Sequence, residues 1–338
     1  MIFPRFSPAV VLLGVASLLP AAALAAKSRP TRPAAVSDAN AYKGAVIMDA
    51  ATGNVLFEDH DGESSPPASM TKLMTFLVIH DKLRSGALTL QTPVTVSAAD
   101  SKIGGTQVWL KENEVFPVED LLYAMMIQSA NDAAHALART AAGSVPAFVE
   151  LMNAKARELG MTHTTFRSPH GLPPSNRRVS EGDLTTPLDF AKLCRHLLIN
   201  TDVLKYTGLK TRNFGEGQRT ADRVIAMSNH DHLLGKVAGV DGLKTGFTNG
   251  AGFCLSATAL RNGRRVIVVV MGSPDSKTRD LKVAELLERG FAALPPGGAA
   301  FAPAPGGAAP EVSPVSAAPV PAPADPTAIK FAVPPRKK

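Results

Sequence analysis

A serine and a lysine three positions apart, Ser69 and Lys72, have the types and spacing of a nucleophile and its base. Residues i and i+3 of a helix share one face, so the two side-chain heads could meet. A lysine can deprotonate a serine only where burial or a second cation lowers its pKa. Chance predicts roughly one such pair in a chain of this length, so the spacing also fits a helix N-cap serine beside a solvated lysine.

A second serine follows at Ser129, two residues before Asn131, in a short connector. Helices are predicted on both sides, over 117–128 and 132–142, because Pro117 suits a first helical turn and Gly143 a C-terminal cap. Such a serine and asparagine could instead bond only to local backbone.

A second lysine, Lys244, opens the string Lys244-Thr245-Gly246 just before two predicted strands over 251–258 and 264–271. Arg261-Asn262-Gly263 between these strands is a turn signal. A cation and a hydroxyl on a strand edge suit a carboxylate ligand, and Lys244 could be the second cation near Lys72. The string is also compatible with an ordinary edge strand.

The elements around Ser69 fit a nucleophile at the start of a helix. Pro66 and Pro67 disfavour a helix before it, and an amphipathic pattern follows as far as Gly86. A backbone N–H in the first turn of a helix has no partner within that helix, so that of Ser69 could point at a developing oxyanion.

Together, these strings resemble the penicillin-recognising serine enzymes, specifically the low-molecular-mass penicillin-binding proteins that are D-alanyl-D-alanine carboxypeptidases. The resemblance covers about residues 41 to 292. Its further matches are Ala45 to Gly53, Pro66 to Met74, Gln128 to Ala133, His170-Gly171-Leu172 and Asp241 to Gly246.

The resemblance implies that Ser69 attacks the terminal D-Ala-D-Ala bond of a peptidoglycan stem peptide, with Lys72 as base. An acyl-enzyme would form and be hydrolysed, and β-lactam antibiotics would be covalent inhibitors. The implied catalytic residues are Ser69, Lys72 and Ser129, and the implied substrate-binding residues are Asn131, Lys244, Thr245, Gly246, Phe247 and Arg279.

Three positions need comment beside this pattern. Relatives often have Asn-Arg-Asn where this chain has Asn229-His230-Asp231, so we expect His230 to be a cation that titrates near neutral pH. Phe247 stands where many relatives have histidine, but only its backbone N–H is needed, for the oxyanion hole. His170 is interpreted as a structural hydrogen-bonding residue of a loop.

The sequence predicts an exported protein with one large domain. Residues 1–25 have the pattern of a secretory signal peptide, an uncleaved anchor being the alternative, and place the chain in the periplasm or otherwise outside the cytoplasm. A linker (26–40), a catalytic domain (41–294) and a Pro/Ala-rich disordered tail (295–338) would follow. We interpret Cys194 and Cys254 as buried thiols, a disulfide remaining possible.

Neither the composition nor the motifs of the chain support a metal-dependent, nucleotide-binding or nucleic-acid-binding function. The net charge of +7 suits an anionic envelope. After removal of the signal peptide we expect weak or no membrane contact, the basic end of the tail being able to touch anionic lipid or wall polymer weakly. There is no glycine-rich phosphate loop, H-E-x-x-H, C-x-x-C or aromatic-basic stripe, so we expect no cofactor, metal or nucleic acid.

The element order predicts an α+β fold, β-lactamase/transpeptidase-like. Strands from both ends would pair in one antiparallel sheet flanked by helices, the last over 278–294, while the middle forms a helical lobe. The main alternative function is a peptidoglycan D,D-endopeptidase that uses the same residues. A non-catalytic wall-binding protein is the alternative of another class. A class A β-lactamase is disfavoured because its second motif is normally Ser-Asp-Asn, whereas this chain has Ala130 before Asn131. In addition, Thr164-Thr165-Phe166-Arg167 stands roughly where the deacylating glutamate of those enzymes would fall.

Overall fold

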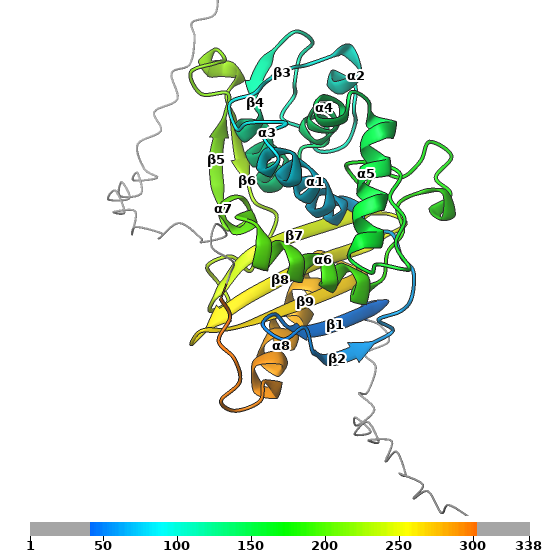
Figure 1. Ribbon diagram of the computed structural model, residues 1–338, viewed down its shortest axis with the longest axis vertical. Helices are drawn as coiled ribbons and strands as arrows, with labels where there is room; N and C mark the ends of the chain where they lie inside the picture. Colours follow the sequence, from blue (N-terminus) through cyan, green and yellow to red (C-terminus); the bar gives the residue numbers. More distant parts are fainter. Residues whose placement is uncertain (1–40, 303–338) are drawn as a thin grey trace, which may run out of the picture. The chain divides into compact units, whose positions relative to one another are not determined.

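Five antiparallel strands form the main sheet of the computed structural model, which describes residues 41–302. Their order is β2-β1-β9-β8-β7, so the N-terminal hairpin pairs with the C-terminal strands and β7 is an edge (Figure 1). The single sheet predicted from both ends of the chain is therefore confirmed. The strands are β1 (Gly44–Asp49), β2 (Val55–Asp59), β7 (Val240–Thr248), β8 (Gly252–Arg261) and β9 (Arg264–Ser273).

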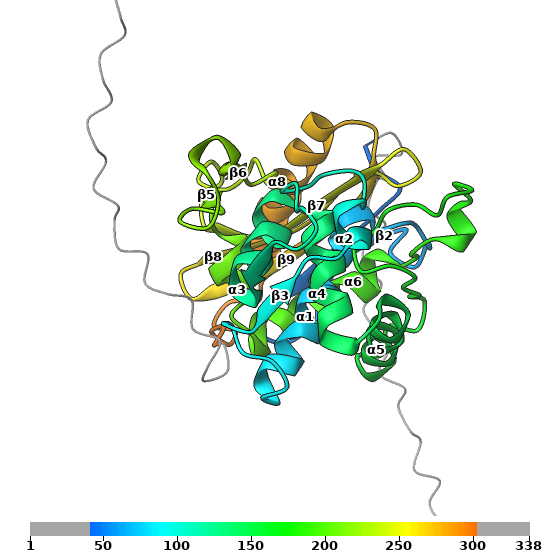
Figure 2. The same ribbon diagram turned by 90° about the horizontal axis from the view of Figure 1, so that it is seen from above.

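Helices cover both faces of this sheet. Figures 1 and 2 show α6 (Pro187–Asn200) on one face and α8 (Ser276–Ala293) on the other. Alternate residues of β9, such as Ile267 and Val269, join the large core on the side of α6. Val266, the residue before Ile267, faces α8 on the other side, where Gly290 allows close approach. Burial of both faces explains why β9 is continuously apolar.

The middle of the chain forms a lobe of helices and two small two-stranded sheets against the β7 edge (Figure 1). The helices are α1 (Lys72–Arg84), α2 (Ala98–Ser101), α3 (Val118–Tyr123), α4 (Asn131–Ala142), α5 (Val145–Glu158) and α7 (Val203–Thr207). The small sheets pair β3 (Pro93–Thr95) with β4 (Val115–Pro117) and β5 (Thr211–Phe214) with β6 (Ile225–Ser228). Short 3₁₀ turns lie at Ala68–Thr71, Val179–Glu181 and Ala221–Arg223, and a π-helical turn at Ala124–Gln128.

Two helix predictions need correction. Ser69 lies in a 3₁₀ turn, and the α-helix begins only at Lys72. The helix predicted over 117–128 begins as strand β4 up to Pro117, continues as α3, and ends in the π-helical turn. The wider turn ends at Ser129, which has left-handed backbone torsions (φ 63°).

The ends of the chain lie partly outside the described residues. The predicted signal peptide, the linker and the tail from residue 303 onward fall there and stay predictions. Residues 295–302, which we assigned to the tail, belong to the described fold, since the Phe301 N–H donates to the Gly263 carbonyl and its ring packs on the core. No helix between residues 41 and 302 is long and apolar enough to span a membrane.

The two cysteines are free and buried, one in α6 and one in β8, as interpreted from the sequence. Burial raises the pKa of the Cys194 thiol to about 12 and that of Cys254 to about 11. Both therefore stay protonated and unreactive at neutral pH.

Candidate active site

Ser69 and Lys72 meet as their spacing predicts. The Lys72 Nζ lies 2.9 Å from the Ser69 Oγ, where the 3₁₀ turn joins the first residue of α1. Gly246 of β7 packs directly on this turn, because a Cβ there would lie 2.5 Å from the Pro67 carbonyl oxygen. The nucleophile segment is thus held against the sheet edge.

Lys72 is fully buried and its amine has three polar partners. Besides Ser69, the Nζ donates to the Asn131 Oδ1 at 2.6 Å and to the His170 carbonyl at 2.8 Å. Desolvation first, and then the positive charge of Lys244, lower the pKa of Lys72 well below its usual value. A neutral amine has two N–H groups and one lone pair. In that neutral form, with the two N–H groups donated to carbonyl oxygens, the lone pair would be left for the Ser69 hydroxyl and could accept its proton.

Ser129 and Asn131 reach the site from the junction of the π-helical turn with α4. Asn131 is the first residue of α4, and its amide also donates to the Gly104 carbonyl at 2.9 Å, which fixes the Oδ1 toward Lys72. The Ser129 Oγ is buried without a hydrogen-bond partner among the described residues. An unpartnered buried hydroxyl is costly, so a ligand that supplies its partner accounts for it best.

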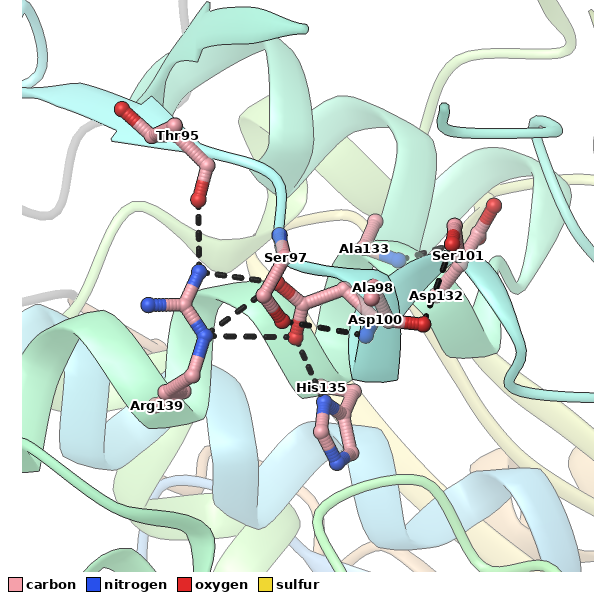
Figure 3. Close-up of polar contacts among 9 residues, drawn as sticks. All are labelled: Thr95, Ser97, Ala98, Asp100, Ser101, Asp132, Ala133, His135 and Arg139. Carbon is pink, nitrogen blue, oxygen red and sulfur yellow. Dashed lines mark hydrogen bonds and ion pairs between the residues drawn. The ribbon is translucent and has the colours of Figure 1, made fainter. Parts of the chain in front are cut away.

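A buried ion-pair network holds α4 in place (Figure 3). Asp100, at the end of the short helix α2, accepts from Arg139 at 2.7 Å and lies 2.6 Å from His135, both on α4. Burial would raise the pKa of Asp100, but bonds from His135, Arg139 and Ser97 outweigh it and hold the pKa well below its usual range. The carboxylate therefore ties α2 to the helix that carries Asn131.

Asp132, which follows Asn131, fixes the loop around residues 106–110 against the start of α4. Its two oxygens accept from the backbone N–H groups of Val108 and Leu110 at 3.3 and 3.0 Å. The Asn131 N–H in turn donates to the Thr106 carbonyl at 2.8 Å. Sequence reasoning did not assign this role to Asp132, although its position beside Asn131 was a signal.

The third string lies on edge strand β7, as predicted. Lys244 and Thr245 are 3% and 6% exposed, so their heads lie in the site and not in bulk solvent. Burial lowers the pKa of Lys244 to about 7, the nearby Asp231 carboxylate opposing and Arg279 adding to this shift. A substrate carboxylate would restore the favourable environment for its charged form.

The start of β7 is fixed by an ion pair between Asp241 and the buried Arg265. Both oxygens of Asp241 accept from Arg265 of β9, each at 2.7 Å. Arg265 is 3% exposed, so this bidentate pair joins β7 to β9 from within the sheet.

Arg279 lies in the first turn of α8, is nearly fully buried and bonds to Asp280 at 2.6 Å. It lies close enough to Lys244 to lower its pKa, which fits the expected positive potential at the carboxylate site. The aromatic ring of Phe247 is half exposed and stacks on Phe253 with ring centroids 4.1 Å apart.

The expectation for His230 was wrong. Burial, followed by the charge of Lys244, lowers the pKa of His230 to about 4, so this imidazole is neutral at neutral pH. Its neighbour Asp231 is buried too, with the pKa raised to about 6 by desolvation. The sequence showed both residue types, but only the fold shows that they lie beside a buried lysine.

The loop 166–184 supports the nucleophile in ways that the sequence did not reveal. Asp183 accepts from the Thr71 hydroxyl at 2.9 Å and from the backbone N–H groups of Arg167 and Ser168 at 2.6 and 2.9 Å. The His170 ring accepts from the Leu172 N–H at 3.2 Å, which agrees with the structural role expected for it. Its carbonyl contact with Lys72 was not foreseen.

Residues 41–302 contain no group of histidine, cysteine and acidic side chains that could hold a metal ion.

The sequence profile of the D-alanyl-D-alanine carboxypeptidase family matches residues 30–275. This chain belongs to that family. D-alanyl-D-alanine carboxypeptidase DacF of Bacillus subtilis is 35% identical over 254 residues, 75% of this chain and 63% of DacF. A D-alanyl-D-alanine endopeptidase of Escherichia coli is 30% identical over 270 residues, 79% of this chain and 83% of that protein. The match thus spans less than two thirds of the length of the carboxypeptidase DacF.

Solved structures of similar proteins share the fold. DacD of Francisella tularensis superposes with a TM-score of 0.70 at 29% identity, covering 79% of this chain and 73% of that one. Penicillin-binding protein D2 of Listeria monocytogenes in an ampicillin-bound form gives 0.64 at 30% identity, covering 74% and 97%. The expected α+β, β-lactamase/transpeptidase-like fold is therefore confirmed.

Proposed function

We propose that this protein is a serine-type D-alanyl-D-alanine carboxypeptidase that removes the terminal D-alanine of peptidoglycan stem pentapeptides. One observation carries the proposal: a buried Lys72 amine with a lowered pKa, 2.9 Å from the Ser69 hydroxyl, has both its N–H groups taken by carbonyl oxygens. Family membership supports the choice of the D-Ala-D-Ala bond.

Acylation follows from this geometry. Lys72 takes the Ser69 proton as the Oγ attacks the carbonyl carbon of the penultimate D-alanine. The backbone N–H groups of Ser69 and Phe247 would hold the oxyanion, and Lys244 with Thr245 would bind the terminal carboxylate. Ser129 would pass a proton to the leaving amine, so free D-alanine departs and an ester remains on Ser69.

Hydrolysis of the ester completes the cycle: water adds to the acyl carbon, and the Ser69 Oγ leaves and regains a proton. Asp183, the carboxylate beside the nucleophile turn, is not available to activate that water, since its oxygens accept four hydrogen bonds from Thr71, Arg167 and Ser168. A β-lactam would acylate Ser69 in the same way and form an inhibitory ester. The ampicillin-bound relative supports this part of the proposal.

The site of action that we propose is the periplasm or another extracytoplasmic compartment, reached through the predicted signal peptide at residues 1–25. The substrate supports this choice, because peptidoglycan lies outside the cytoplasm. An alkaline phosphatase fused after residue 40 and exported by that segment would be active; an inactive fusion would contradict the proposal.

A D,D-endopeptidase is the second candidate, favoured by the similarity to the endopeptidase of Escherichia coli, of which the match covers 83%. The two activities differ in the leaving amine, which is free D-alanine or a cross-linked peptide. A non-catalytic wall-binding role has no support, because every side chain needed for acylation is present and assembled.

The experiment offers the purified protein a muramyl pentapeptide and a cross-linked dimer, and measures D-alanine release beside dimer cleavage. We expect D-alanine release to dominate and Ser69→Ala to abolish it. Faster cleavage of the dimer would favour the endopeptidase. Inactivity on both substrates, with Ser69→Ala behaving as wild type, would contradict the enzymatic proposal.

A further inference from the structure

A cavity of about 520 Å³ opens beside the nucleophile turn, and no step of the proposed reaction uses it. Ala68 and Phe247 form its wall toward Ser69, and Leu172 and Val179 give it an apolar lining. Arg177 and Asn249 contribute polar side chains. The lining therefore suits a side chain with an apolar stem and a polar end.

The order of groups along β7 places this cavity on the acyl side of the scissile bond. Lys244 and Thr245 would bind the terminal carboxylate, and the Phe247 N–H the reacting carbonyl. The cavity residues Thr248 to Gly250 come next. A strand advances roughly 3.3 Å per residue, so an extended peptide on this edge would bring the residue before the two D-alanines to the cavity.

Arg177 is the one cation among the residues that line this cavity. Its side chain is exposed, and its guanidinium has no hydrogen-bond or ion-pair partner within residues 41–302. The neighbouring Arg178 differs, since it pairs with Glu181 at 3.3 Å. Arg177 also adopts a left-handed backbone (φ 58°), which is uncommon for a residue with a long side chain.

The loop that carries Arg177 is attached to the nucleophile turn at both ends. At Gly171 (φ 83°) a Cβ would lie 1.9 Å from the Ala68 carbonyl oxygen, so only glycine fits there. At the other end, Asp183 bonds to Thr71. Asp183 lines the cavity too, but its carboxylate is buried and already accepts several hydrogen bonds. The two ends of the loop that carries Arg177 are therefore fixed relative to the nucleophile turn.

We propose that this cavity, which we call the acyl-side pocket, binds the residue that precedes D-Ala-D-Ala when its side chain ends in a carboxylate, and that Arg177 binds that carboxylate. The guanidinium is free for a bidentate contact, and the apolar walls cover the methylene stem. This inference rests on the proposed function and specifies which stem peptides the site prefers.

The test compares two isosteric substrates, N-acetyl-L-2-aminopimelyl-D-Ala-D-Ala and the same peptide with its side-chain carboxylate converted to the carboxamide. We expect wild type to favour the carboxylate by about tenfold in kcat/KM, a value typical of one charge-assisted contact at an accessible site. In Arg177→Ala the preference disappears, because turnover of the carboxylate peptide falls while that of the carboxamide is unchanged. Arg177→Lys keeps part of the preference.

Arg178→Ala is the matched control, one residue away on the same loop, and should keep the full preference. The rate of acylation by benzylpenicillin reports on the nucleophile and should be the same in all variants. Equal turnover of both peptides by wild type, or an equal loss on both in Arg177→Ala, would overturn the pocket assignment alone. Absence of D-alanine release from either peptide would overturn the proposed function with it.

Discussion

Two buried lysines lie at the centre of this site. Desolvation lowers the pKa of both; the charge of Lys244 further lowers that of Lys72, and the charge of Arg279 further lowers that of Lys244. The more distant Asp183 and Asp132 oppose the shift at Lys72 without reversing it, which supports the proposed role of Lys72 as the base. Lys244 has Asp231 nearby, which keeps the pKa of this second lysine close to neutral, where it can still bind an anion.

Lys72→Arg should abolish acylation, because it replaces an amine that can lose its proton with a group that cannot. A guanidinium stays protonated at any accessible pH, so it cannot accept the Ser69 proton, and loss of a general base costs about a thousandfold in rate. The measurement is the second-order rate of acylation by benzylpenicillin. Lys155→Arg, which changes an ion-paired lysine on α5, should react like wild type. Acylation by Lys72→Arg within tenfold of wild type would contradict the role of Lys72.

The alkaline limb of kcat/KM should come from Lys244. Its charged form binds the substrate carboxylate, and its pKa in the free enzyme is about 7, so kcat/KM falls roughly tenfold per pH unit above that value. Lys244→Arg should remove this limb, since the guanidinium does not titrate there. His230→Ala should leave the profile above pH 6 unchanged, because His230 is already neutral. A limb that persists in Lys244→Arg would assign it to another group.

At the scale of elements, the site is a meeting of four segments that are distant in the sequence. The 3₁₀ turn before α1, the junction of the π-helical turn with α4, the edge strand β7 and the loop 166–184 each supply groups around Lys72. The relative positions of these segments are fixed by side-chain contacts between them. Asp100 and Asp183 are the carboxylates that make two of these connections.

Asp100→Ala should destabilise the fold by about 3 kcal/mol, because removing one partner leaves Arg139 and His135 without their buried anion. The pKa of Asp100 is lowered in the fold, so its contribution is complete above its unfolded pKa of about 3.9 and decreases as the pH falls below that value. Urea unfolding at pH 7 and pH 3 measures both effects.

The matched control is Asp222→Ala, an exposed carboxylate in the 3₁₀ turn Ala221–Arg223, which should change stability by less than about 0.5 kcal/mol. Equal effects of the two substitutions at pH 7 would show that the Asp100 network does not hold α2 to α4.

At the scale of the whole molecule, the sequence predicted the features that follow from residue spacing, strand and helix patterns and motif order. The Ser69–Lys72 contact, the edge strand with Lys244 and the sheet built from both ends follow from spacing, apolar patterns and family resemblance. Burial could not be predicted, because it depends on packing between distant segments. For that reason the sequence misjudged His230, and it did not reveal the acyl-side pocket around Arg177.

In the proposed mechanism, catalysis and substrate binding are divided between the two parts of the fold. The helical lobe would supply the base from α1 and the proton relay from the turn before α4, whereas the sheet would supply the carboxylate-binding residues on β7 (Figure 1). An extended peptide on the β7 edge would contact both parts. The account as a whole therefore depends on Ser69 being the residue that becomes acylated.

Mass spectrometry of the full chain after exposure to benzylpenicillin tests this claim most directly. We predict one covalent adduct per molecule, located on Ser69 by peptide mapping and absent from Ser69→Ala. Ser101→Ala, a substitution of another serine that bonds only to nearby backbone, should acylate like wild type. An adduct that survives in Ser69→Ala, or that maps to another residue, would contradict the account.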